Sequence, residues 1–310
     1  MTEYGGILRD AYPLCLGGNI FGWTIGEEES FAVLDAYAAA GGNLIDTADV
    51  YSVWADGNSG GESESIIGSW MASRGNRDEI IVATKVGALT GVSADEVRAG
   101  AEDSLRRLQT DRIDLYYTHK DDEAVPLEET LGALDALVRE GKVRELGASG
   151  YSAARLGEAL AVSDRESLSR YQVIQPHYNL LERDAYEGEL QDLCEREGLA
   201  CLPFFSLARG FLTGKYRPGE EADTLRGGFA WGGEWDARTT ALLEALDAVA
   251  ADHGTTDAAV ALAWLHAQPT VAAPIASART AEQLSQLVPM AALELDAGEL
   301  ERLTRAGAPA

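Results

Sequence analysis

Short apolar segments alternate with longer amphipathic segments along almost the whole chain. The apolar segments are four to seven residues long and are bounded by turn residues, which is typical of β-strands. Because they are largely apolar rather than strictly alternating, we expect parallel strands that are covered on both faces. Eight strands are predicted, at 14–17, 43–46, 80–85, 113–119, 144–149, 171–175, 200–204 and 271–275.

The amphipathic segments between the strands have the spacing of helices. Glycines follow several of them, as expected of left-handed C-caps, and Ser93 with Glu96 has the spacing of a capping box. The predicted helices span 31–40, 93–108, 127–140, 184–197, 237–252, 256–267, 280–287 and 299–305.

This alternation predicts an α/β fold with a parallel sheet, and eight is the strand number of the (β/α)8 TIM barrel. We therefore expect one barrel domain over residues 1–310. An open doubly wound sheet is the alternative, but residues 17–22 lack its Gly-x-Gly-x-x-Gly turn. Residues 210–236 interrupt the alternation and are rich in glycine and aromatic side chains, which predicts a lid over the barrel mouth after the seventh strand.

Composition narrows the classes of partner. The chain has 310 residues, of which 46% are hydrophobic and 25% charged, as in ordinary globular proteins. The net charge of −26 repels nucleic acids and anionic membranes, so neither is expected as a partner. Whether this acidity reflects adaptation to high salt is left open. Three cysteines without metal-ligand spacing, and no export signal or membrane span, lead us to expect a cytoplasmic protein without a metal site.

Four polar residues lie at or just after the ends of neighbouring predicted strands: Asp46, Tyr51, Lys85 and His119. In a TIM barrel, side chains at the carboxyl ends of the strands converge on one mouth. An ammonium lowers the pKa of a nearby phenol, and a carboxylate keeps a buried ammonium charged. We expect Tyr51 to act as general acid, tuned by Lys85 and Asp46, while His119 orients a carbonyl substrate.

Several segments resemble the aldo-keto reductases. Residues 46–51 match the Asp-Thr-Ala-x-x-Tyr signature of that family, and 82–85 and 114–119 match its lysine and histidine strands. Residues 175–180 and 207–216 match its Gln-x-x-Tyr-Asn-Leu segment and the loop after its seventh strand. The resemblance implies a TIM barrel that reduces a small aldehyde or ketone with NADPH, or alternatively NADH, bound without a Rossmann fold.

The resemblance also implies positions that contact the cofactor. Phe204 falls where a family tyrosine stacks on the nicotinamide ring, and the guanidinium of Arg279 suits a ribose 2′-phosphate. Gly150, Ser277 and Leu287 depart from residues common in the family, which leaves the choice between NADPH and NADH open. The implied cofactor residues are Gly18, Asn19, Ser149, Gln175, Phe204, Phe205, Leu207, Arg209, Gly210, Lys215, Ser277, Arg279 and Gln283.

Trp23 and Trp54 follow the first strand and Tyr51, so we expect them to line a substrate pocket that favours apolar or ring-shaped carbonyl compounds. The sequence leaves two alternative functions open. The chain could be a cofactor-binding accessory protein, like the potassium-channel beta subunits that resemble the same family. It could also be a barrel lyase that uses Lys85 as a Schiff-base nucleophile. The sequence leaves the substrate and the oligomeric state undefined.

Overall fold

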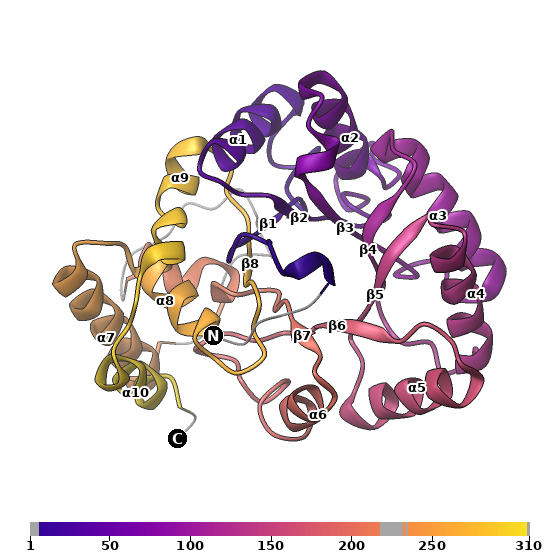
Figure 1. Ribbon diagram of the computed structural model, residues 1–310. Coiled ribbons are helices and arrows are strands. Elements are labelled where there is room, and N and C mark those ends of the chain that lie inside the picture. The colour runs from indigo at the N-terminus through magenta and orange to yellow at the C-terminus, as the bar shows by residue number, and fades with distance from the viewer. Residues whose placement is uncertain (1–5, 218–231, 234, 309–310) are drawn as a thin grey trace.

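The computed structural model describes residues 6–217, 232–233 and 235–308. Within this part, parallel strands form a sheet in the order β7-β6-β5-β4-β3-β2-β1-β8, and helices surround it (Figure 1). The predicted (β/α)8 barrel is confirmed. Its strands are β1 (Cys15–Gly17), β2 (Leu44–Asp46), β3 (Ile81–Val86), β4 (Ile113–Thr118), β5 (Val143–Ser149), β6 (Tyr171–Gln175), β7 (Ala200–Cys201) and β8 (Ile275–Ala276).

The barrel closes through the segment that precedes β8. The amide of Cys201 donates to the carbonyl of Thr270 at 2.7 Å, and the amide of Ala272 donates to the carbonyl of Cys201 at 2.9 Å. The predicted strand 271–275 is therefore wrong in its bounds. Val271 makes only an isolated bridge to β7, and Pro274, which has no amide hydrogen, interrupts the ladder before β8.

The α-helices follow the strands around the barrel. The capping box predicted for Ser93 and Glu96 is present at the start of α3. The helices are α1 (Glu27–Ala39), α2 (Glu62–Arg74), α3 (Ala94–Leu108), α4 (Leu127–Arg139), α5 (Ala153–Glu166), α6 (Glu189–Glu197), α7 (Ala237–His253), α8 (Asp257–His266), α9 (Ala281–Ser285) and α10 (Ala297–Ala306). Short 3₁₀ helices are η1 (Gly6–Leu8), η2 (Arg77–Glu79), η3 (Ala208–Thr213) and η5 (Val288–Ala292).

Two of these helices, α2 and α5, were not predicted. The buried face of α2 includes Ser63, Glu64 and Gly68, so polar and small residues hide its apolar stripe. The apolar stripe of α5 is regular, with Leu156 and Leu160 buried. This helix could therefore have been predicted from the sequence. The helix expected over 184–197 begins only at Glu189.

Alternation along each strand separates the interior of the barrel from the layer under the helices. Leu44, Ala83, Leu115 and Val173 belong to a small cluster inside the barrel. A much larger cluster lies between strands and helices. Gly147 leaves room inside for a ring, because a Cβ there would lie 2.3 Å from Tyr117 Cδ1.

The predicted lid at 210–236 is only partly described. Residues 218–231 and 234, which include Phe229 and Trp231, lie outside the described residues. In the first part of the segment, Phe211 in η3 is fully buried and its ring lies 5.7 Å from that of Trp235, so this side chain belongs to the core. The part of the chain that the structure describes contains no helix long and apolar enough to span a bilayer.

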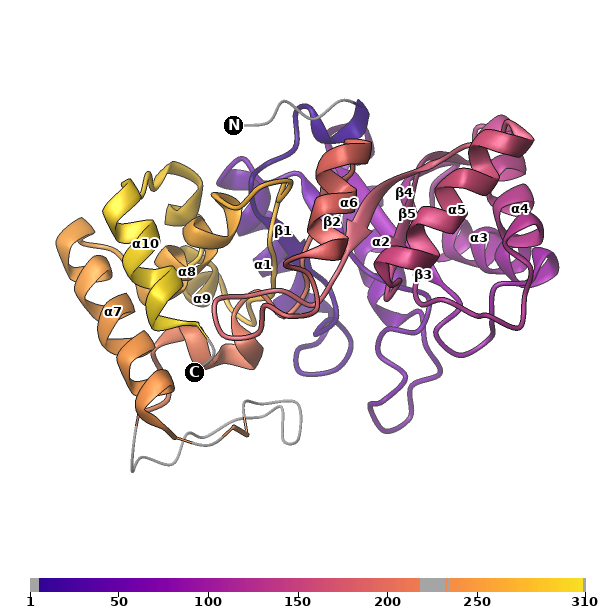
Figure 2. The same ribbon diagram turned by 90° about the horizontal axis from the view of Figure 1, so that it is seen from below.

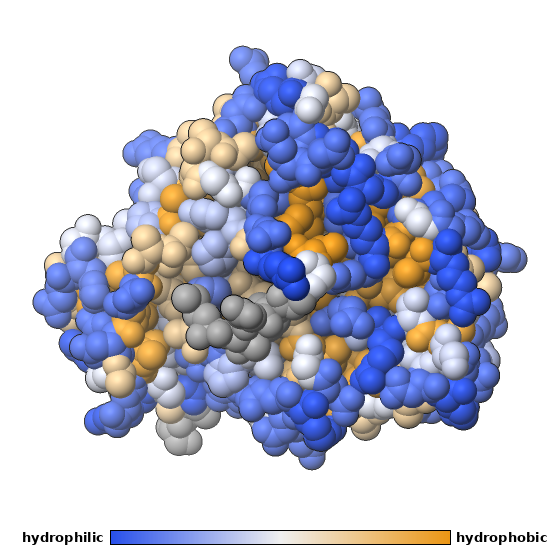
Figure 3. Space-filling model, viewed as in Figure 1, coloured by the Kyte–Doolittle hydropathy of each residue, from blue (hydrophilic) through white to orange (hydrophobic). Residues whose placement is uncertain are grey.

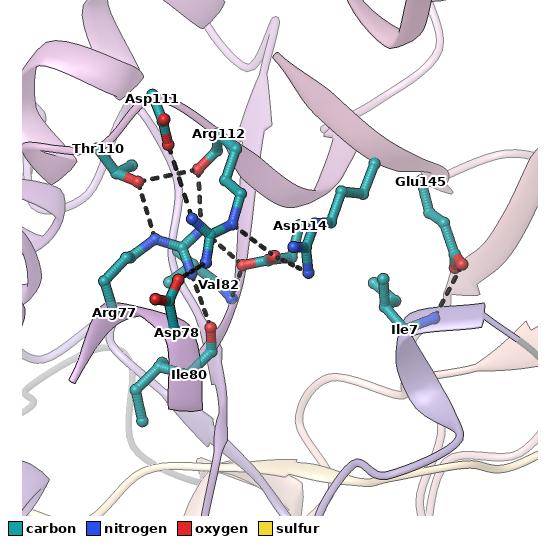
Figure 4. A network of polar contacts seen from close by, with 11 residues as sticks. Ile7, Arg77, Asp78, Ile80, Val82, Thr110, Asp111, Arg112, Asp114 and Glu145 are labelled. Atoms are coloured by element: carbon teal, nitrogen blue, oxygen red, sulfur yellow. Dashed lines mark hydrogen bonds and ion pairs between the residues drawn. The ribbon is translucent and has the colours of Figure 1, made fainter. Parts of the chain in front are cut away.

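A charged network lies at the amino-terminal end of the strands, the face toward the viewer in Figure 1. Polar residues cover most of the rim of this face (Figure 3). The buried Asp114 carboxylate accepts from Arg77 at 2.7 Å and from the amide of Val82 at 2.9 Å (Figure 4). Arg144 lies 3.1 Å from its other oxygen. This carboxylate thus joins η2, β3, β4 and β5.

We expect Asp114→Ala to lower the free energy of unfolding by about 3 kcal/mol, because half-buried Arg77 loses its counterion. Urea denaturation measures this loss. Asp78→Ala is the matched control, because Asp78 pairs with Arg112 but is 90% exposed, so its loss should cost about 1 kcal/mol or less. Equal losses in the two variants would contradict a structural role that depends on burial.

Candidate active site

The four polar residues at the strand ends meet at the carboxyl-terminal mouth of the barrel. Asp46 is the last residue of β2, and Lys85 lies one residue before the end of β3. His119 directly follows β4, and Tyr51 lies in the loop after β2. Figure 2 shows loops on this side of the barrel, opposite the amino terminus.

Lys85 connects the other members of this group. Its Nζ donates to Asp46 Oδ2 and to the carbonyl of Thr47, each at 2.7 Å, and to the Tyr51 hydroxyl at 3.3 Å. The side chain of Lys85 is 0% exposed, so these three oxygens replace water around the ammonium. The result is a continuous hydrogen-bonded chain from the buried carboxylate to the phenol.

Burial disfavours the Lys85 ammonium, but Asp46 and Tyr51 favour it more, so the pKa of Lys85 is raised above its ordinary value. A charged lysine is the reverse of what a Schiff-base nucleophile requires, which argues against the lyase. Burial also raises the pKa of Tyr51, although Lys85 opposes this effect. The expected direction of the effect of Lys85 is thus present, although burial outweighs it.

His119 lies beside Tyr51, with ring centroids 5.9 Å apart. Burial, and next the charge of Lys85, lower the pKa of His119 to about 3. Its Nδ1 is buried without a hydrogen-bond partner among the described residues. A neutral imidazole in this position can hydrogen-bond a polar ligand group but carries no charge near neutral pH.

A cavity of about 810 Å³ opens beside Tyr51, Asp46 and His119. It is lined by nearly all the cofactor residues that the family resemblance implied, and by Trp23 and Trp54, which their positions in the sequence predicted. Gly18 is the exception: its amide donates to the carbonyl of Asp46 at 2.7 Å, and a Cβ there would lie 2.8 Å from Ser63 Oγ. Lys85 lies behind the cavity wall, where it contacts Tyr51 and Asp46.

The cavity suits an anionic ligand. Arg209, Lys215 and Arg279 all line it, although the chain as a whole carries a net charge of −26. Asn19 and Ser277, from opposite ends of the sequence, meet there in a 2.7 Å hydrogen bond. A dinucleotide with a pyrophosphate and a nicotinamide would fit the volume, the cations and the polar groups of this cavity.

Some pocket features were missed from the sequence. The side-chain amide of Gln175 donates to Asp46 Oδ1 at 2.8 Å, so it orients the buried carboxylate as well as lining the cavity. Thr213, Tyr216 and Gln286 also line the cavity. Gln286 could have been found from its spacing, because it lies one helical turn beyond Gln283.

Aromatic rings form the wall next to Tyr51. The rings of Trp23 and Trp54 meet edge to face at 5.7 Å, and Trp54 lies 5.5 Å from Tyr51 at 62°. Edge-to-face contacts of this kind hold large rings in defined orientations. The wall therefore presents flat apolar surface next to the phenol hydroxyl.

Residues 13–308 match the model of the aldo/keto reductase family. The chain is 35% identical over 309 residues to norsolorinic acid reductase stcV of Emericella nidulans, covering 93% of this chain and 76% of that protein. It is 34% identical over 315 residues to Protein tas of Escherichia coli, with 91% and 90% covered. It is 31% identical over 312 residues to an aryl-alcohol dehydrogenase of Pestalotiopsis microspora, with 94% and 78% covered. With its barrel fold and this similarity over nearly its whole length, the chain belongs to the aldo/keto reductase family of oxidoreductases.

Proposed function

We propose that this chain, acting as one domain over residues 1–310, reduces an aldehyde or ketone to an alcohol with NADPH. The observation that carries the proposal is the chain of contacts from Asp46 through Lys85 to the Tyr51 hydroxyl, at the edge of a cavity of about 810 Å³. The nicotinamide cofactor, when bound, supplies the hydride to the carbonyl carbon.

Tyr51 is the general acid in this proposal. Its protonated phenol donates to the carbonyl oxygen as negative charge develops there. The Lys85 ammonium then stabilises the phenolate that remains, and Asp46 keeps that ammonium charged. His119, neutral and adjacent, donates the N–H of its imidazole to the carbonyl oxygen and so fixes the direction of the carbonyl.

The aromatic wall formed by Trp23 and Trp54 favours uncharged, ring-shaped carbonyl substrates. Two relatives carry names that agree with this class, a norsolorinic acid reductase and an aryl-alcohol dehydrogenase. Aromatic aldehydes are therefore the first substrates to assay. Negligible turnover of such a panel, combined with a stoichiometric protein partner, would favour the accessory-protein alternative instead.

Arg279 supports NADPH over NADH, because it lines the cavity and its guanidinium, at the position that the family resemblance assigns to the adenosine end, can pair with a 2′-phosphate. In a fluorescence titration we expect Arg279→Ala to raise the Kd of NADPH by at least about tenfold and to leave that of NADH nearly unchanged. Arg305→Ala, at an exposed position on α10, is the matched control. An equal loss for both cofactors would contradict recognition of the 2′-phosphate.

Because the pKa of His119 is lowered to about 3, its imidazole stays neutral over the whole working range. We expect kcat for carbonyl reduction to show no ionisation of this group between about pH 5 and 8. An inflection near pH 6.5 that disappears in His119→Gln would contradict this. In the unfolded chain this histidine is protonated below about pH 6.5, whereas in the folded protein it stays neutral down to about pH 3. His119 therefore lowers the free energy of unfolding as the pH falls from about 6.5 toward 3.

A further inference from the structure

A polar pair lies in the loop that follows β6, outside the group formed by Asp46, Tyr51, Lys85 and His119. Nε2 of His177 is 2.8 Å from Oε2 of Glu182, and the two side chains are 26% and 39% exposed. The Glu182 oxygen also accepts from Asn179 Nδ2 at 3.0 Å. The hydrogen bond with His177 lowers the pKa of Glu182 to about 2, so this carboxylate is ionised at neutral pH.

Asn179 fixes the loop that carries this pair. Its Oδ1 accepts from the amides of Leu181 and Glu182, and its Nδ2 also donates to the carbonyl of Phe205 at 3.0 Å. Phe205 has a φ of 53°, which costs free energy for a residue with a side chain. The loop after β6 therefore holds the loop after β7 in a strained conformation at the cavity wall.

The two loops bring the His177 ring against Phe204. The β6–β7 pairing extends beyond the strands by one parallel bridge between these residues, and the amide of Phe204 donates to the carbonyl of Pro176 at 2.9 Å. The rings are stacked, with centroids 5.4 Å apart and planes 25° apart. Phe204 lines the cavity, whereas His177 is not among the described residues that do. His177 thus packs on one face of Phe204, while Phe204 itself borders the cavity.

We propose that His177, held by Glu182, is a positioning residue for the cofactor: it fixes the ring of Phe204 as the platform for the nicotinamide without touching the cofactor itself. This inference rests on the proposed function and on the stacking of Phe204 on that ring, which the family resemblance implies. A phenyl side chain turns about two bonds, and ordering it on binding weakens affinity. A ring packed behind it, itself oriented by a charged hydrogen bond, removes that freedom before the cofactor arrives.

The chain offers a matched control. Nε2 of His253 lies 2.7 Å from Oε1 of Glu299, with side chains 29% and 20% exposed, and this pair joins α7 to α10 without lining the cavity among the described residues. The variants to compare are His177→Ala, which removes the ring; His177→Phe, which keeps a ring behind Phe204; and His253→Ala. Two probes are titrated into each: NADPH, and 2′-phospho-ADP-ribose, which lacks the nicotinamide.

We expect His177→Ala to raise the Kd of NADPH about tenfold while the Kd of 2′-phospho-ADP-ribose changes less than about twofold. His177→Phe should recover most of the affinity for NADPH. His253→Ala should lower Tm without changing either Kd. The inference is overturned if His177→Ala binds NADPH like the wild type, if both probes weaken together, or if His177→Phe fails to restore binding. Wild-type protein that binds neither NADPH nor NADH would instead overturn the proposed function itself.

Discussion

Replacing Tyr51 with phenylalanine is expected to lower kcat for carbonyl reduction by about 10³-fold and to leave the Kd of NADPH unchanged. The ring and its contacts with Trp54 and His119 remain, so the pocket keeps its shape. What is lost is the hydroxyl that Lys85 contacts at 3.3 Å, and with it the proton donor for the developing alkoxide. Steady-state kinetics with an aromatic aldehyde, together with a cofactor titration, measure both quantities.

Tyr216→Phe is the matched control, because it removes a hydroxyl from another tyrosine that lines the same cavity. It should retain most of the wild-type kcat. Substantial turnover by Tyr51→Phe would exclude Tyr51 as the general acid. A similar loss in both variants would mean that the cavity, rather than the phenol proton, accounts for the effect.

Lys85→Met is expected to impair both activity and stability. The kcat should fall about 10²- to 10³-fold, because the phenolate that forms when Tyr51 gives up its proton loses its nearby positive charge. The free energy of unfolding should fall by about 3–5 kcal/mol, because Asp46, 2% exposed, is left without its counterion. Urea denaturation and single-turnover kinetics test the two effects separately.

The double variant Asp46→Asn with Lys85→Met separates the two roles of the lysine. Removing both charges should recover much of the stability, because no unpaired buried charge remains, while the activity stays low. The amide of Gln175 can still hydrogen-bond the side chain at position 46. If the double variant is less stable than the single variant, the ion pair is not what Lys85 contributes to folding.

The barrel and the membership of its family followed from local sequence patterns. Short apolar segments between amphipathic ones indicate strands and helices because each pattern repeats with the period of its own backbone geometry. The polar residues at strand ends could be identified because parallel strands bring their carboxyl ends to one mouth. Their roles in catalysis and cofactor binding stay predictions. Helix α2 was missed where buried polar residues broke the pattern, and part of the expected lid, at Phe211, belongs to the core.

Other properties depend on segments far apart in the chain. The direction of the Tyr51 pKa follows from a balance between burial and Lys85, which no spacing of residues reveals. Gln175 reaches Asp46 across 129 positions, and His177 stacks on Phe204 only because a further parallel bridge joins the segments that follow β6 and β7. Local periodicity is enough to choose strands and helices, but desolvation and contacts across the barrel exist only once it has closed. Desolvation and these contacts determine the charges of the titratable side chains in the site, and the contacts also hold Phe204, the platform that we propose for the cofactor.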